Sequence, residues 1–116
     1  MLTFSPAVKL WYATQPVSMR LGFDGLFALV KNKLQADPLS GHLFIFRNRT
    51  ADRLKVLYWS GHGLSLFCQR LEQGRYHFPD APPDAASIEL SAVQFQMILD
   101  GIDVSRARRF KRFSVP

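Results

Sequence analysis

Four basic residues surround one short polar segment and have the chemistry to bind phosphate groups. They lie around a predicted turn over residues 48–52: Arg47, Arg49, Arg53 and Lys55. A guanidinium binds phosphate oxygens through paired hydrogen bonds, and neutralised phosphates release counterions. We expect the four charges to cluster at one tip of a β-hairpin, a ribbon of the size that enters a DNA major groove. The simpler interpretation is that these residues keep an exposed hairpin end soluble.

A second cationic segment lies near the end of the sequence. Five of its residues are basic: Arg106, Arg108, Arg109, Lys111 and Arg112. Phe110 and Phe113 are interleaved with them and could stack on bases or pack on the domain. We expect residues 106–116 to form a flexible tail with nonspecific affinity for nucleic acid. The alternative is a solvated tail that associates with any polyanion.

Arg20 is the third candidate for phosphate binding. It precedes Asp24 by four residues, which on a helix would allow an ion pair. We favour that ion pair as the role of Arg20. The functional alternative places Arg20 on the anion-binding surface beside the hairpin.

Catalytic and metal-binding sites are not predicted. The three histidines and the cysteine have no zinc-ligand spacing, and no nucleophile motif, glycine-rich phosphate loop or dinucleotide fingerprint occurs. Asp24 is the carboxylate that a cryptic nuclease would use, and its simpler role is a cap or a partner of Arg20. We therefore predict a non-enzyme with no cofactor and no metal.

The charge distribution favours a polyanionic partner. The 116 residues carry a net charge of +6, but residues 76–105 carry −5 and the other residues +11. Such a division can attract a polyanion to one surface. Nucleic acid is the leading partner class, ahead of an anionic membrane surface, and we expect no membrane partner. One cysteine cannot form an internal disulfide and no secretory signal is present, so we expect a cytoplasmic protein.

Short strands with a period of two dominate the middle of the chain. The pattern predicts strands over residues 8–14, 42–47, 53–59, 64–71 and 75–78, and allows one more over 87–90. Short loops between them indicate an antiparallel meander. Both faces of the strand over 42–47 are apolar, so this strand should be central or covered on both sides.

Two helices complete the predicted fold. The first helix carries an apolar stripe and begins either after Ser18 or near Asp24, which the sequence leaves open. The second follows Ser91 as its cap and ends at Gly101. We predict an α+β fold with a small antiparallel β-meander sheet and two packed helices, as one domain over residues 1–105. The expected core residues are Leu10, Phe23, Leu26, Val30, Phe44, Phe46, Val56, Leu66, Phe95 and Leu99.

Several long blocks of the sequence resemble a known family. Two are its signature blocks, MRLGFDGL at 19–26 and DPLSGHLFIFRNR at 37–49, and shorter ones lie at 55–59, 70–76 and 99–103. From residue 8 to 103 the chain resembles the TnpB-type accessory proteins. These are encoded by the second open reading frame of the insertion-sequence-sixty-six transposable elements. Ser60 and Gln69 depart from the family, which often has an acidic residue and a lysine there.

The resemblance implies a bacterial mobile-element protein that assists transposition, is distinct from the transposase and has no established catalytic residues. We predict an accessory protein that binds DNA through the hairpin and the tail. The alternative is an assembly module that docks the transposase or a sister accessory protein through the acidic stretch at 80–103 and the second helix. The predicted nucleic-acid-binding residues are Arg20, Arg47, Arg49, Arg53, Lys55, Arg106, Arg108, Arg109, Lys111 and Arg112.

Overall fold

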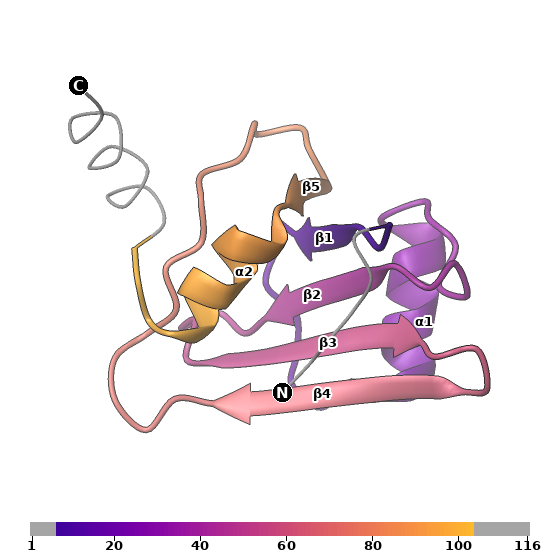
Figure 1. Cartoon of the computed structure of the whole chain (residues 1–116), viewed down its shortest axis with the longest axis horizontal. Helices are drawn as coiled ribbons and strands as arrows, with labels where there is room; N and C mark the ends of the chain where they lie inside the picture. The colour runs from indigo at the N-terminus through magenta and orange to yellow at the C-terminus, as the bar shows by residue number, and fades with distance from the viewer. Residues whose placement is uncertain (1–6, 104–116) are drawn as a thin grey trace.

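The chain folds as one open β-sheet with a helix against each face, as the computed structural model shows for residues 7–103 (Figure 1). The elements in chain order are β1 (Leu10–Ala13), α1 (Phe23–Asn32), β2 (Leu43–Arg47), β3 (Arg53–Trp59), β4 (Leu64–Arg70), β5 (Ser87–Leu90) and α2 (Ala92–Leu99). The predicted α+β class is confirmed. No helix within these residues has the length and apolar character needed to cross a bilayer.

The sheet has the strand order β4-β3-β2-β1-β5. The predicted antiparallel meander is confirmed for β2, β3 and β4. The sheet as a whole is mixed, because β1 pairs with β2 in parallel, with Leu10 beside Leu43. A parallel neighbour requires a long crossover, and the segment that contains α1 provides it. The late strand β5 then joins the free side of β1 in antiparallel pairing.

The central strand β2 separates two hydrophobic clusters. Successive side chains of a strand point to opposite faces, so Leu43 and Ile45 pack in the cluster that includes residues of α2. Phe44 and Phe46 pack in the other cluster, with residues of α1. All four side chains are buried, which confirms that this strand is covered on both sides.

Helix α1 begins at the later of the two predicted positions. Its cap residue is Gly22, and no side chain caps it. The Ser18 hydroxyl instead accepts a hydrogen bond from the Arg20 N–H in the turn before the helix. Leu26 and Val30 are fully buried, but Phe23 is 47% exposed and its predicted place in the core is wrong. Burial of the apolar stripe decreases toward the first residue of the helix.

Helix α2 has both of its predicted ends. The Ser91 Oγ accepts a hydrogen bond from the Gln94 N–H at 3.0 Å, and the Gln94 side chain accepts one from the Ser91 N–H at 2.9 Å. This reciprocal pair is a capping box. At the other end Gly101 has φ +78°, and the N–H of the next residue reaches back to the Met97 carbonyl at 2.9 Å. Glycine adopts this left-handed conformation without strain.

Most of the other expected core residues are buried, on the strands and on both helices: Leu10, Phe44, Phe46, Val56, Leu26, Val30 and Phe95. Leu66 and Leu99 are only partly buried, at the margins of the two clusters. Leu66 lies on the edge strand β4, which has no neighbour on its outer side within the described sheet. Leu99 is the last residue of α2. Their partial burial therefore follows from their places at the ends of the layers.

The predicted strand over residues 75–78 is wrong. These residues belong to a long connection between β4 and β5 that crosses the α2 face of the sheet. The Tyr76 N–H donates to the Ala51 carbonyl at 2.6 Å, and its hydroxyl donates to the Gln69 Oε1 at 2.7 Å. The Phe78 ring stacks on Tyr12 with centroids 4.3 Å apart. Side-chain packing therefore anchors this segment, and Pro79 just after it cannot donate to a ladder.

Candidate nucleic-acid interface

The turn between β2 and β3 is held by a side-chain network. The Asn48 Oδ1 accepts from the Asp52 and Arg53 N–H groups, both at 3.1 Å. The Asp52 carboxylate in turn accepts from the Asn48 amide at 2.7 Å and from the Thr50 hydroxyl at 2.9 Å. These donors lower the pKa of Asp52, chiefly the Asn48 amide. The network fixes the backbone from which Arg49 projects.

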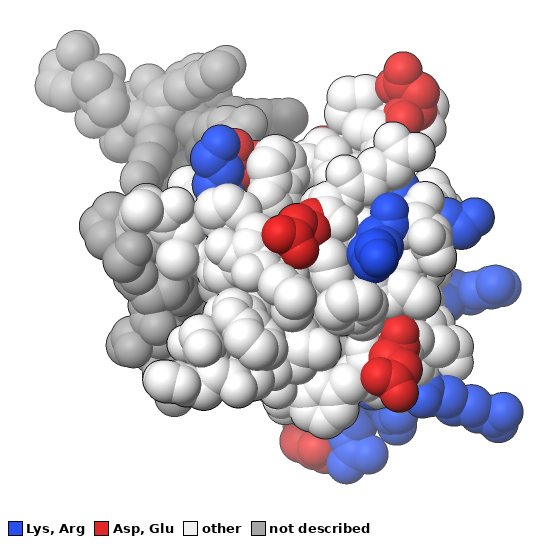
Figure 2. Space-filling view, turned by 90° about the vertical axis from the view of Figure 1, so that its right-hand side faces the viewer, with Lys and Arg blue, Asp and Glu red and all other residues white. Residues whose placement is uncertain are grey.

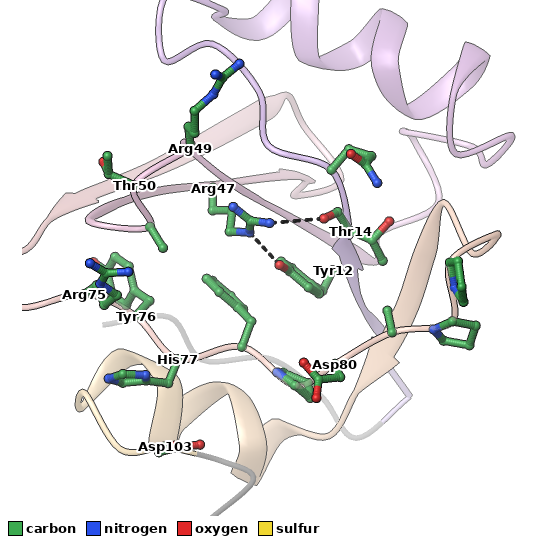
Figure 3. A pocket seen from close by; sticks show the side chains of 17 residues that line it. Tyr12, Thr14, Arg47, Arg49, Thr50, Arg75, Tyr76, His77, Asp80 and Asp103 are labelled. Carbon is green, nitrogen blue, oxygen red and sulfur yellow. Dashed lines mark hydrogen bonds between the residues drawn. The ribbon is translucent and has the colours of Figure 1, made fainter.

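Within residues 7–103, Arg47 donates only to neutral oxygens. Its Nε donates to the Tyr12 hydroxyl at 2.7 Å, its Nη2 to the Thr14 carbonyl at 3.3 Å and its Nη1 to the Asn48 carbonyl at 3.2 Å (Figure 3). No described carboxylate lies within 4.0 Å of it. The guanidinium is therefore half-buried and fixed in orientation, but its charge has no anionic partner in the described part of the chain.

Lys55 is also held by neutral acceptors, on the other face of the sheet. Its Nζ donates to the carbonyls of Met19 and Leu21, both at 2.8 Å. Two of its three N–H groups are thus occupied. The lysine ties the segment before α1 to strand β3, and this contact also brings the neighbourhood of Arg20 to the same face.

The four hairpin cations lie at one end of the strands but on two faces of the sheet. Arg47 pairs with Leu54 and Lys55 pairs with Phe46, so Arg47 and Lys55 point to opposite faces. Arg47 and Arg49 line a cleft on the α2 face. Arg53 and Lys55 line a groove of about 430 Å³ on the α1 face. The expected cluster is therefore divided by the sheet.

The groove on the α1 face is rich in arginine. Arg53 stands directly opposite Arg70 on β4, an arrangement that like charges disfavour. Arg70 pairs with Glu72 at 3.4 Å, and both side chains are exposed. Arg53 has no ion pair within the described residues. An anion in this groove would relieve the repulsion between the two guanidiniums.

The cleft on the α2 face has a volume of about 570 Å³. One wall is the hairpin end with Arg47 and Arg49, and the other is the connection that crosses the sheet (Figure 3). That connection contributes Arg75, which the alternation pattern placed in a strand and which was not among the predicted binding residues. The sequence does show an arginine directly before Tyr76. Its position close to the hairpin, however, depends on a contact between segments that are distant in the sequence.

Arg20 does not form the predicted ion pair with Asp24. The side chain is exposed and precedes α1, and no contact within 4.0 Å joins it to Asp24 in the described structure. The prediction is wrong because the helix begins at Phe23, so the two residues do not share a helical face. The five basic residues from Arg106 to Arg112 lie outside the described residues.

The basic residues are spread unevenly over the surface. In Figure 2, Lys and Arg side chains project mainly from the right-hand side, which is the side of α1, with acidic side chains between them. The exposed cations of the described chain include Lys9, Arg20, Lys31, Lys33, Arg49, Arg53, Arg70 and Arg75. The molecule therefore offers several exposed positive groups outside the hairpin, which any test of the hairpin must control for.

The comparison with known protein families agrees with the blocks noted in the sequence. The family described as IS66 Orf2 like protein matches residues 8–109 of the chain. The chain belongs to this family. The IS66 Orf2-like proteins are transposable-element accessory proteins, so this chain is a protein of an insertion sequence, and the resemblance stated from the sequence is confirmed.

Two curated relatives of this IS66 Orf2-like protein come from Sinorhizobium fredii (strain NBRC 101917 / NGR234). Uncharacterized protein y4jC is 39% identical over 105 residues, which cover 90% of this chain and 88% of the relative. Uncharacterized protein y4hO is 40% identical over 103 residues, which cover 89% and 88%. No solved structure gives a significant match.

Proposed function

We propose that this IS66 Orf2-like protein is a non-catalytic accessory factor that binds DNA through phosphate contacts to assist transposition. The observation that carries the proposal is the state of Arg47. Its half-buried guanidinium is fixed by three neutral acceptors and has no anionic partner in the described chain. Arg49 and Arg75 line the same cleft.

A fixed, partly desolvated cation favours an incoming anion. Burying a charge costs free energy unless it is paired, and that cost is already met by the fold at Arg47. Three of the five guanidinium N–H groups are used, which leaves donors for a phosphate oxygen. Because the acceptors hold the side chain, little rotamer entropy is lost when a phosphate binds.

The division of the hairpin cations suits contacts to a DNA backbone. Arg49 and Arg53 are exposed on either side of one rigid turn, and neither makes an ion pair in the described structure. Phosphate contacts of this kind position a protein on DNA but do not read base sequence. We therefore infer backbone binding by the hairpin and no sequence recognition by these arginines.

A gel-shift titration across salt tests this function. The double substitution Arg49→Gln with Arg53→Gln should lower the slope of log affinity against log salt by about 0.9 for each phosphate that is no longer neutralised. The matched control is Lys9→Gln with Lys31→Gln, which removes equal charge. Lys9 lies at the end of the sheet away from the hairpin. The next residue, Leu10, pairs with the first residue of β2, and Arg47 at the hairpin is the last residue of that strand. The control should leave the slope unchanged.

Two results would count against DNA binding by the hairpin. One is the absence of any complex at about 50 mM salt, where phosphate contacts are strong. The other is an equal decrease of the slope in the test and control variants, which would make the affinity a property of net charge alone.

A second candidate function is assembly with the element's transposase. Two apolar side chains at α2 support it: Val93 is 60% exposed and Ile102 is 43% exposed. A pull-down of co-expressed element proteins with nuclease added would separate the two functions. A complex that survives the nuclease and is abolished by Val93→Asp would favour assembly, and a complex that dissociates on nuclease treatment would favour a DNA bridge.

A further inference from the structure

We propose that the cleft on the α2 face binds one unpaired nucleotide of a DNA strand. Its phosphate would lie against Arg47 and Arg75, and its base against the segment 77–80. This inference rests on the proposed DNA binding and names the form of DNA that the cleft selects.

The size of the cleft matches a single nucleotide. Sites for small ligands span roughly 300 to 1,000 Å³, and this cleft holds about 570 Å³. A double helix, with a major groove alone about 12 Å wide, is far too large to enter it. The exposed arginines can meet the backbone phosphates of either form of DNA, but only a base that has left the duplex, or one that was never paired, can lie against the segment 77–80.

One side of the cleft has the donors that a phosphate needs. Figure 3 shows the Arg47 guanidinium held between the Tyr12 hydroxyl and the Thr14 carbonyl. Arg49 and Arg75 lie at the cleft from the two opposite walls, and both are exposed. The Arg49 side chain points away from Arg47 in Figure 3, so the fixed Arg47 and the exposed Arg75 are the two cations that can hold one phosphodiester, from opposite walls.

The other side of the cleft has acceptor and stacking groups. Asp80 lines the cleft, is exposed and makes no hydrogen bond to another described residue. Its carboxylate can accept hydrogen bonds from the exocyclic amino groups of adenine, cytosine or guanine. The Phe78 ring, stacked on Tyr12, lines the same wall and offers a flat surface for a base, whereas the His77 ring points toward α2 in Figure 3.

The charge pattern of the cleft favours a whole nucleotide over backbone phosphates alone. The Asp80 carboxylate belongs to the connection, which is the wall opposite the hairpin end that carries Arg47. Carboxylates repel a second phosphate, and a surface built for backbone alone gains nothing from them. A nucleotide has an anionic end and, in three of the four bases, an amino end. Its polarity therefore matches that of the cleft.

Fluorescence anisotropy with labelled DNAs of one sequence tests the proposal on the full chain. The DNAs are a single strand of about ten nucleotides, the blunt duplex and a duplex with an overhang of about three nucleotides. Single strand and overhang should bind at least about fivefold more tightly than the blunt duplex, since base stacking adds to the phosphate contacts. Arg75→Gln should weaken single-strand binding more than duplex binding.

Asp80→Ala gives the sharper readout. It should weaken binding of a cytosine homopolymer about threefold or more and that of a thymine homopolymer less, because thymine has no exocyclic amino group and offers only its N3–H as a donor. The control is Asp84→Ala, an exposed acidic residue of the same connection that does not line the cleft. It should affect the two homopolymers alike.

The results distinguish this inference from the proposed function. Equal affinity for single strand and duplex, with Asp80→Ala strengthening binding of every DNA, would overturn the nucleotide site and leave backbone binding in place. No binding of any DNA at about 50 mM salt would overturn both. Because Arg75 and Asp80 are exposed, circular dichroism of these variants should match the parent chain.

Discussion

Neighbouring arginines in this protein serve different purposes because their acceptors differ. Arg47 ties the end of β2 to Tyr12 and Thr14, more than thirty residues earlier in the chain. Arg49, two residues on, is exposed and has no hydrogen-bond partner among the described residues. Residue type and spacing therefore identify both as cations, but only distant contacts decide which one is also part of the fold.

This difference predicts unequal effects on stability. Arg47→Ala should lower the free energy of unfolding by about 2 kcal/mol, because it leaves the buried Tyr12 hydroxyl without its partner. Arg49→Ala should change it by less than about 0.5 kcal/mol. Urea unfolding of both variants measures this, and equal midpoints would mean that the bonds of Arg47 contribute no stability.

The raised pKa of Tyr76 predicts that the folded chain loses stability in alkali. Burial, with a smaller contribution from the Asp52 charge, raises its pKa from 10.0 to about 12. A raised pKa means that the folded state favours the neutral phenol. Its contribution is therefore complete below pH 10 and is lost as the pH rises toward 12. Between pH 9 and pH 11 the free energy of unfolding, measured with urea, should decrease less for Tyr76→Phe than for the parent chain.

At the scale of the elements, local signals predicted α2 and the strands β2 to β4 correctly. The cap at Ser91 and the glycine at 101 lie within one helix length of each other, and alternation is visible inside each strand. The errors arose where distant segments decide the outcome. The parallel position of β1 and the coil at residues 75–78 both depend on contacts across the sheet. The face on which each hairpin cation lies follows from strand register, which composition does not reveal.

The capping box of α2 gives a prediction at this scale. Ser91→Ala should lower the free energy of unfolding by about 1 kcal/mol, because the Gln94 N–H loses its acceptor. Ser91→Asp should stay close to the parent chain, since aspartate caps as well as serine. Thermal unfolding of the three chains measures the difference. A Ser91→Asp chain as unstable as Ser91→Ala would show that the effect does not come from capping.

At the scale of the whole molecule, the sheet separates two cationic surfaces. The α1-face groove joins Arg53 and Arg70, and the α2-face cleft joins Arg47, Arg49 and Arg75. The sequence predicted that charges gather at the hairpin, but the sheet divides them between a groove of about 430 Å³ and a cleft of about 570 Å³ that are lined by different residues. Under the two proposals the groove would contact duplex backbone and the cleft an unpaired nucleotide, so that one hairpin would hold DNA at a junction between them.

Removal of the basic residues after Ser105 should lower the affinity for DNA without changing the stability of the fold. Every buried residue of the two clusters lies between Leu10 and Ile98, so a chain that ends at Ser105 should unfold at the same urea concentration as the full chain. Its net charge falls from +6 to +1. Duplex affinity at low salt should therefore decrease about tenfold or more, with a shallower salt slope.

A full-length chain with the five basic residues from 106 to 112 changed to glutamine is the matched control, because it keeps the length and removes the charge. It should reproduce the loss of affinity seen on truncation. If it binds like the parent chain, length rather than charge is responsible. If the truncated chain itself binds duplex DNA as tightly as the parent, the hairpin and its two cationic surfaces are sufficient, and residues 106–116 have no part in the interface.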